Sequence, residues 1–190
     1  MPRISLPSPE EMSPAQRQVY DKIISGRRGK IQGPLRAALH NAELAERWQS
    51  LGELLRYQTS LPPRQSELAI LVTARACRSP FEWYAHRIEA EKVGVEPEVI
   101  DAILKELTPP GLSTGDQLVV RFASELNAIR SVSDSTYAEA LAHFGDRTVV
   151  ELTALVGYYT MVALTLNAHE IPLPEGVQPA FPLPQQERIA

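Results

Sequence analysis

Apolar side chains recur along most of this chain every three or four residues, which is the spacing of one face of an α-helix. Pro, Gly, Ser and Asp, the residues that commonly begin and end helices, separate these stretches. The pattern predicts helices at residues 13–26, 34–40, 43–57, 63–74, 79–94, 97–107, 113–129, 133–144 and 146–167. No stretch alternates between apolar and polar positions as a strand does, so we predict an all-α fold, a single-domain helical bundle.

The two ends of the chain lack this helical spacing. Residues 1–12 contain three prolines and are expected to form an extended arm over the body or over a neighbouring subunit. The proline-rich end, residues 172–190, is expected to be an extended tail. Residues 13–171 then form one helical domain, because 190 residues with 44% hydrophobic content suffice for one compact core.

Two of the predicted helices place their apolar residues in different ways. Helix 43–57 carries core spacing at Leu44, Trp48, Leu51, Leu54 and Leu55. Helix 146–167 is apolar on most faces, and such a helix is central or sandwiched between subunits. Tyr158 brings a polar group to this helix, which makes it a candidate for a pocket wall; a tyrosine satisfied within the core is the alternative.

Glu67 interrupts a helix that is otherwise almost entirely apolar from residue 68 to residue 74. A carboxylate near the N-terminus of a helix can simply be a capping acid. A functional role is the other interpretation, because a helix this apolar must pack on more than one side. That packing would place Glu67 against the following helix.

Glu82, His86 and Glu89 fall at positions i, i+4 and i+7 of that following helix and therefore share one face. A carboxylate one turn before an imidazole can orient it and raise its pKa, which gives an acid or base that works near neutral pH. A surface Glu–His pair of little consequence is the alternative. Because Trp83 and its aromatic neighbours are too apolar for a solvated face, we favour a lined pocket, with Trp83 in its wall, or an interface.

The run LPPRQSELAILVTARACRSPFEWYAHRIEAEKVGVEPEVIDAI, which contains these residues, resembles the core motif of the carboxymuconolactone decarboxylase family. The superfamily to which this family belongs also contains the alkylhydroperoxidase D proteins. The pattern E-L-A-I-L, then E-W-x-x-H and a following G-V is its strongest part, within a likeness that extends over residues 33–174. The resemblance implies an all-helical subunit, a homo-oligomer (a dimer, trimer or hexamer) and a site near Glu67 and His86.

The peroxidase branch of this superfamily carries C-x-x-C-x-x-x-H, in which both cysteines perform thiol redox chemistry. Counted back from His86, those positions hold Ser79 and Glu82, and neither is a thiol. Cys77 is the single cysteine, which excludes an intramolecular dithiol cycle. The sequence is therefore similar to the decarboxylase-type branch, which implies chemistry by ionisable side chains without a cofactor.

The segment GRRGKIQGP has three glycines and three cations between two predicted helices. Such a loop is commonly just a solvated connector. The functional interpretation is that Arg27, Arg28 or Lys30 closes over a pocket and holds a substrate carboxylate, since a guanidinium binds that group bidentately.

Composition narrows the choice of partners. A net charge of −4 with interspersed acids and bases leaves no basic stripe, which argues against nucleic acid. We find no apolar stretch of membrane-span length without interruption, and one cysteine fits a reducing compartment, so we expect a cytoplasmic protein without membrane contact. A metal is not expected, because helical di-iron sites use two copies of Glu-x-x-His, whereas this chain has Glu-x-x-x-His once.

Three hypotheses of function follow. The first is a cofactor-free, carboxy-lyase-like enzyme for a small carboxylated compound of the lactone or aromatic-degradation type. His86 would be its general acid/base, and Glu67 and Glu82 would orient His86 or shuttle protons. The second is a thiol-dependent, peroxidase-like protein that uses Cys77, which requires a depressed thiol pKa. The third is a non-catalytic helical oligomer.

Overall fold

The structure is a computed structural model that describes residues 2–26 and 29–182. Its elements are a short 3-10 helix, η1 Pro9–Glu11, and the helices α1 Pro14–Ser25, α2 Pro34–Ala38, α3 Ala42–Tyr57, α4 Pro63–Ala76, α5 Pro80–Lys92, α6 Pro97–Leu104, α7 Thr114–Ile129 and α8 Asp134–Ala168. No strand occurs within the described ranges, and the all-α prediction is confirmed.

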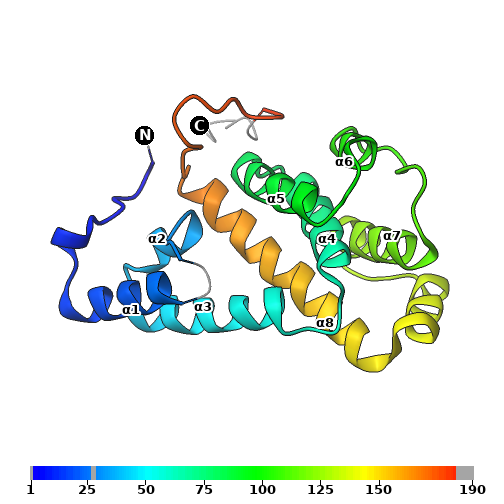
Figure 1. Ribbon diagram of the computed structural model, residues 1–190, viewed down its shortest axis with the longest axis horizontal. Coiled ribbons are helices and arrows are strands. Elements are labelled where there is room, and N and C mark those ends of the chain that lie inside the picture. The colour runs from blue at the N-terminus through cyan, green and yellow to red at the C-terminus, as the bar shows by residue number, and fades with distance from the viewer. Residues whose placement is uncertain (1, 27–28, 183–190) are drawn as a thin grey trace, which may run out of the picture.

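Helix α8 occupies the middle of the bundle (Figure 1). Along its length, α8 packs against α2 and α3 on one side and against α4, α5 and α7 on the other. Buried apolar side chains lie along the part of α8 that follows Gly145, at Leu152, Leu155, Val156, Val162, Ala163 and Leu166. Of the two placements predicted for this helix, central or sandwiched between subunits, the structure of the single chain shows the central one.

Gly145 breaks the helical geometry inside α8, with φ 76° and ψ 167°. Glycine adopts a positive φ without the steric cost that a side chain would add, which explains why the change of direction falls at this residue. The two helices predicted at 133–144 and 146–167 are thus the two arms of α8, which meet at a kink.

Among the described residues, α8 is also long and apolar enough to cross a membrane by length and composition, which differs from the expectation drawn from the sequence. The structure joins the two predicted helices, 133–144 and 146–167, across the kink at Gly145 into one element. A core helix meets the same criteria, and 50% of the apolar window is buried inside the bundle.

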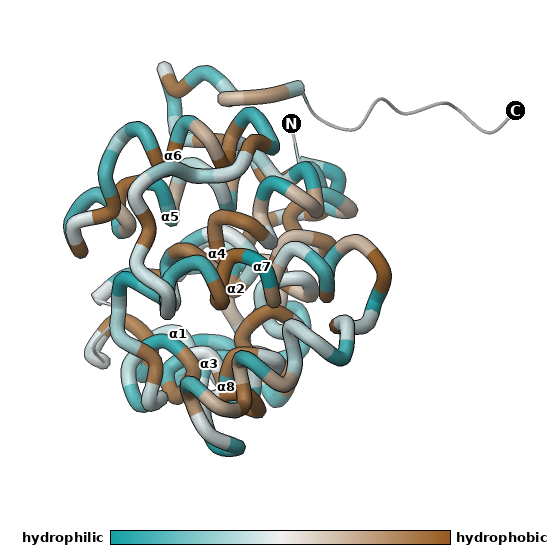
Figure 2. The backbone as a smooth tube through the Cα atoms, turned by 90° about the vertical axis from the view of Figure 1, so that its right-hand side faces the viewer, coloured by the Kyte–Doolittle hydropathy of each residue, from teal (hydrophilic) through white to brown (hydrophobic). Residues whose placement is uncertain are grey.

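Helix α4 is buried at every position from Ser66 to Ala74. Figure 2 shows apolar positions gathered where this helix crosses the middle of the bundle. Proline at its first position needs no N–H partner and favours helical φ, so the start at Pro63 follows from the sequence. A short turn then leads into α5, which packs along α4. This pairing brings Glu67 of α4 against α5.

Helix α3 buries Trp48 and Leu55, as its spacing predicts. The other three leucines of the predicted core face are nearly half exposed, at 49% for Leu44, 46% for Leu51 and 45% for Leu54. The prediction was wrong for these three, because α3 lies at the edge of the bundle and packs on only part of its circumference (Figure 1).

Both ends of the described chain lie against the body. The N-terminal arm is held by an ion pair of 2.9 Å between Arg3 and Glu170, and the His40 ring is 2.8 Å from the carbonyl oxygen of Ser5. In the C-terminal tail, the Phe181 ring packs edge-to-face on Trp83 with centroids 6.0 Å apart.

Candidate active site

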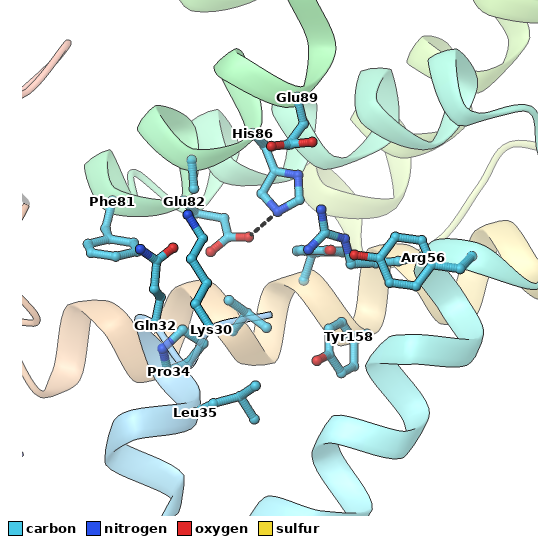
Figure 3. A pocket seen from close by; sticks show the side chains of 14 residues that line it. Lys30, Gln32, Pro34, Leu35, Arg56, Phe81, Glu82, His86, Glu89 and Tyr158 are labelled. Atoms are coloured by element: carbon cyan, nitrogen blue, oxygen red, sulfur yellow. Dashed lines mark ion pairs between the residues drawn. The ribbon is translucent and has the colours of Figure 1, made fainter. Parts of the chain in front are cut away.

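His86 is held between two carboxylates. Its Nδ1 atom lies 2.7 Å from Oε2 of Glu67. Its Nε2 atom lies 3.0 Å from Oε1 of Glu82, and Figure 3 marks this second contact with a dashed line. All three side chains are buried, with exposed fractions of 5% for His86, 7% for Glu67 and 4% for Glu82. The structure therefore brings together the three residues that the sequence singled out as catalytic candidates.

Local helix geometry explains this arrangement. Glu82 and His86 are one turn apart on α5, so their side chains lie on the same face and can meet. Glu67 reaches the other ring nitrogen from α4, which packs beside α5. The imidazole is thus fixed from two helices, and its ring orientation is determined by the carboxylates on either side.

Burial by itself would lower the pKa of His86, because it disfavours the charged imidazolium. The carboxylates of Glu67 and Glu82 outweigh burial and raise the pKa of His86 to about 9. At neutral pH the ring is therefore protonated, and each nitrogen donates a hydrogen bond to a carboxylate. A buried imidazolium of this kind is a proton donor rather than a free base.

A cavity of about 290 Å³ opens beside this cluster, bounded by α2, α3, α5, α8 and the segment that precedes α2. Its walls are formed by Lys30, Gln32, Pro34, Leu35, Arg56, Tyr57, Phe81, Glu82, Ala85, His86, Glu89, Tyr158, Tyr159 and Val162. Glu67 does not line the cavity and lies behind His86. Figure 3 shows Glu82 and His86 at the wall, with the side chain of Lys30 close to them.

Lys30 is one of the three cations that the sequence offered as candidates. It lines the cavity from the segment that precedes α2. Arg27 and Arg28, the other two, lie outside the described residues. Gly33 allows this segment to approach α5, because its φ of 52° suits glycine and an added Cβ would lie 2.9 Å from Cε1 of Phe81.

Arg56 is a second cation in the cavity wall, and the sequence analysis missed it. It comes from the last turn of α3, where a basic residue is ordinarily explained by the helix dipole. Its guanidinium lies 5.2 Å from the centroid of the Tyr57 ring. Burial opposes the charge, but Tyr159, Tyr57, Glu67 and Glu82 raise the pKa of Arg56 above its ordinary value, so it stays charged.

Two tyrosines of α8 form the aromatic part of the wall. Tyr158 lines the cavity, where the sequence analysis placed it as a candidate. Tyr159 packs edge-to-face on the His86 ring with centroids 4.8 Å apart, and burial raises the pKa of Tyr159 well above its ordinary value. Its neutral phenol ring covers the imidazolium and limits the access of water to it.

Trp83 is not a wall residue, which corrects the prediction made from the sequence. Its side chain is only 1% exposed and packs on Phe181. The position directly after Glu82 points about 100° around the helix, away from the face shared by Glu82 and His86. Trp83 therefore belongs to the core and does not reach the cavity.

The thiol of Cys77 lies outside the walls of the cavity. Cys77 follows the last residue of α4 and is partly buried. Burial raises the pKa of Cys77 above its ordinary value, although a hydrogen bond to Thr160 and the charge of Arg130 oppose this. The side chain is therefore kept as a thiol, which is the less reactive form.

These features define an all-helical protein with a buried acid/base cluster beside a small cavity. Residues 42–125 match the carboxymuconolactone decarboxylase family, which confirms the resemblance seen in the sequence. This segment, from α3 to most of α7, belongs to that family and contains Glu67, Glu82 and His86. No curated protein sequence matches the chain significantly.

Solved structures show the same fold at low sequence identity. An uncharacterized peroxidase-related protein from Silicibacter sp. TM1040 superposes with a TM-score of 0.75 and 15% identity, covering 90% of this chain and 91% of its own. The alkylhydroperoxidase AhpD core protein from Ralstonia eutropha JMP134 is also peroxidase-related and uncharacterized. It superposes with a TM-score of 0.76 and 14% identity, covering 92% of this chain and 93% of its own. The debrominase Bmp8 in complex with 2,3,4-tribromopyrrole superposes with a TM-score of 0.70 and 12% identity, covering 85% of this chain and 87% of its own. The fold is thus that of the AhpD-like proteins.

Proposed function

We propose that this protein is a cofactor-free acid/base enzyme of the carboxy-lyase type that acts on a small carboxylated compound. One observation carries the proposal: His86 is held as an imidazolium between Glu67 and Glu82 beside a cavity that also contains two cations, Lys30 and Arg56. The cations can bind an anionic substrate, and the imidazolium can supply a proton.

Substrate binding is the role of the cations and the aromatic wall. Arg56 can hold a carboxylate through two parallel hydrogen bonds, whereas Lys30 acts as a point charge. Phe81 and Tyr158 offer ring faces to an unsaturated or cyclic substrate. A cavity of about 290 Å³ suits a compound of one ring. The fold neighbour Bmp8 in complex with 2,3,4-tribromopyrrole supports binding of a small ring compound by this fold.

The chemistry proposed for the site is loss of CO2 followed by protonation. When the bond between the carboxylate carbon and its neighbour breaks, CO2 leaves and the electron pair stays on the substrate as an enolate or dienolate. The cation that does not hold a carboxylate can stabilise the oxygen on which this charge builds up. The carbon that lost CO2 then takes a proton.

His86 supplies that proton in this proposal. The Nε2–H group points toward Glu82 at the cavity wall, so the proton can pass to the substrate directly or through the Glu82 carboxylate. Glu67 keeps its hydrogen bond to Nδ1 and fixes the ring while the charge on His86 changes. Solvent restores the proton after product release.

The alternative, a thiol-dependent peroxidase that uses Cys77, has weaker support. Its burial favours the thiol, and it lies outside the cavity. The two positions at which the peroxidase branch has cysteines hold Ser79 and Glu82, and Glu82 here is a partner of His86. A purely structural role for the buried cluster is the other alternative, since Glu67 and Glu82 also interact electrostatically with Arg56.

The experiment that tests the proposal follows the fate of the carboxylate in D2O. Protein without added cofactor is incubated with 4-carboxymuconolactone and with a panel of small lactone acids and aromatic-derived acids. We expect CO2 release and one deuterium on the carbon that lost the carboxylate, seen by NMR. His86→Ala should slow the appearance of both signals by roughly 10²–10⁴-fold, and the surface variant Arg47→Met on α3 should show them at the wild-type rate. If none of the acids releases CO2, and if the protein consumes a hydroperoxide in a reaction that requires Cys77, the peroxidase hypothesis would be favoured instead.

A homo-oligomer is the second part of the proposal. An exposed stripe runs along the outer face of α8 at Val150, Ala154, Gly157, Met161 and Leu164, spaced alternately by four and three residues. Val150 and Leu164 are 66% and 59% exposed. Small residues in the middle of such a stripe allow close approach of another helix. We propose that a second copy of this chain covers the stripe.

A further inference from the structure

We propose that Glu89 determines the specificity of the His86 cavity. It selects a substrate that carries one carboxylate and, at another position, a hydroxyl group, and it disfavours a dicarboxylate. This role rests on the function proposed above, in which Lys30 and Arg56 bind an anionic substrate. Glu89 lines the same cavity, and the chemistry proposed for His86 does not use it.

The position of Glu89 follows from the geometry of α5. It comes one turn after His86, on the helix face that His86 shares with Glu82, so its side chain reaches the same cavity. Figure 3 shows its carboxylate beside the His86 ring. The side chain of Glu89 is 39% exposed, whereas that of Glu82 is buried. Glu89 is therefore the acid at the solvent-exposed end of this face.

Glu89 is an anion at neutral pH. Its Oε1 atom lies 2.9 Å from Nζ of Lys92, a residue that is 63% exposed and does not line the cavity. The hydrogen bond from Lys92 lowers the pKa of Glu89, and the charges of Arg56 and His86 act in the same direction against partial burial. A carboxylate has about four acceptor sites on its two oxygens, so the pairing with Lys92 leaves sites for a substrate.

The charges around the cavity disfavour a second carboxylate on the substrate. Lys30 and Arg56 bring two positive charges to the wall. The buried cluster of the His86 imidazolium and its two carboxylates has a net charge of one negative, and Glu89 adds another. The cations are thus balanced by the protein itself before a substrate binds.

A first carboxylate still gains the two parallel hydrogen bonds that Arg56 can offer. A second carboxylate in a cavity of about 290 Å³ would lie near Glu89 or the buried cluster, and like charges at such distances repel. A hydroxyl group can instead donate a hydrogen bond to Glu89. Among the acids of the D2O experiment, those with one carboxylate and a hydroxyl group should therefore bind best.

The test compares 4-hydroxybenzoate with terephthalate, two acids of one ring that differ in the group opposite the carboxylate. Calorimetry at neutral pH measures binding directly and does not depend on turnover. We expect the wild-type protein to bind 4-hydroxybenzoate about tenfold more tightly than terephthalate. Glu89→Gln should reduce this preference to roughly threefold or less, mainly because terephthalate binds more tightly once the negative charge is removed.

Glu91→Gln is the matched control on the same helix. Glu91 is exposed, pairs with Arg87 and does not line the cavity, so this variant should keep the wild-type preference. An exposed ion pair contributes little to stability, so Glu89→Gln should unfold at a temperature close to that of the wild-type protein.

Arg56→Met separates the role of Glu89 from the proposed function. It should weaken the binding of both acids by about tenfold or more, because the charged hydrogen bonds to the carboxylate are lost. If the wild-type protein binds the two acids equally, or if Glu89→Gln keeps the full preference, Glu89 does not set the specificity. Weaker binding of both acids to Arg56→Met would then still support the proposed function. If neither acid binds, or if Arg56→Met binds both as the wild-type protein does, the proposed function fails together with the role of Glu89.

Discussion

The Nδ1 atom of His86 lies 2.7 Å from Oε2 of Glu67, although the two residues are 19 positions apart and lie on different helices. This contact turns a Glu–His pair within one helix into a cluster of three groups across two helices. The position and the charge of the imidazole therefore depend on how α4 packs against α5.

The first prediction concerns the cluster as a catalytic unit. His86→Ala and Glu82→Gln should each lower turnover by roughly 10²–10⁴-fold, the usual contribution of a positioned acid or base. The double variant should lose little more than either single variant, because groups that act together are not additive. Steady-state kinetics on the acid found in the D2O experiment measures this.

Thermal unfolding of the same variants separates a loss of activity from a loss of fold. Removal of one partner should lower the melting temperature, because an unpaired charge is left buried, so turnover is measured below the melting temperature of each variant. A double variant that is folded and has ordinary activity would contradict the catalytic role.

The second prediction is that stability depends on the protonation of His86. Its pKa is about 9 in the folded protein, compared with 6.5 for an unperturbed histidine. The stabilisation is therefore fully present below pH 6.5 and is lost as the pH rises through 9. We expect the free energy of unfolding to fall by on the order of 3 kcal/mol over this interval.

Urea unfolding at a series of pH values checks this second prediction. His86→Asn removes the titrating group and should flatten the dependence between pH 6.5 and 9. Stability that rises with pH in the wild-type protein would contradict the sign of the pKa shift.

Much of the fold can be predicted from the sequence because local signals mark most helix ends. Ser13 and Pro14 begin α1, Pro63 begins α4, and Gly145 marks the kink of α8. The exposure of Leu44 could not be predicted, because a face that packs in the core and a face left open have the same spacing.

The candidate site divides in the same way. Glu82 and His86 share one helix, so their proximity follows from the spacing alone. Arg56 could not be found, since only the packing of α3 against α8 carries the end of α3 to the cavity. Trp83 misled the prediction because an aromatic residue beside an active-site acid can face either the core or the cavity.

The third prediction concerns Arg56, the cation that could not be found from the sequence. Arg56→Met should raise KM roughly 10- to 100-fold, because a hydrogen-bonded charge pair with the substrate is lost. The KM of Arg56→Lys should lie between the values for the wild-type protein and for Arg56→Met, since an ammonium keeps the charge but cannot bind a carboxylate bidentately. Arg47→Met is the matched control, as Arg47 lies on α3 in an exposed ion pair with Glu43. Equal KM values for Arg56→Met and the control would exclude Arg56 from substrate binding.

The fourth prediction is that Cys77 takes no part in turnover. Cys77→Ser should leave kcat and KM near the wild-type values, because burial keeps this side chain a thiol and the cavity does not include it. Serine is close in size and shape, so the fold should be retained. Loss of turnover in a folded Cys77→Ser protein would restore the thiol-dependent hypothesis.

The last prediction tests the outer stripe of α8. Light scattering at micromolar concentration should show the wild-type chain as a homo-oligomer, and Leu164→Glu should dissociate it, because a charge would have to be buried against the second copy. Ile129→Glu is the control, since Ile129 on α7 has a similar exposure of 64% but lies outside the stripe. Leu164 is 59% exposed in the single chain, so the substitution should leave the fold of the subunit unchanged by circular dichroism. A monomeric wild type would refute the oligomer, and an unchanged Leu164→Glu oligomer would move the interface to another face.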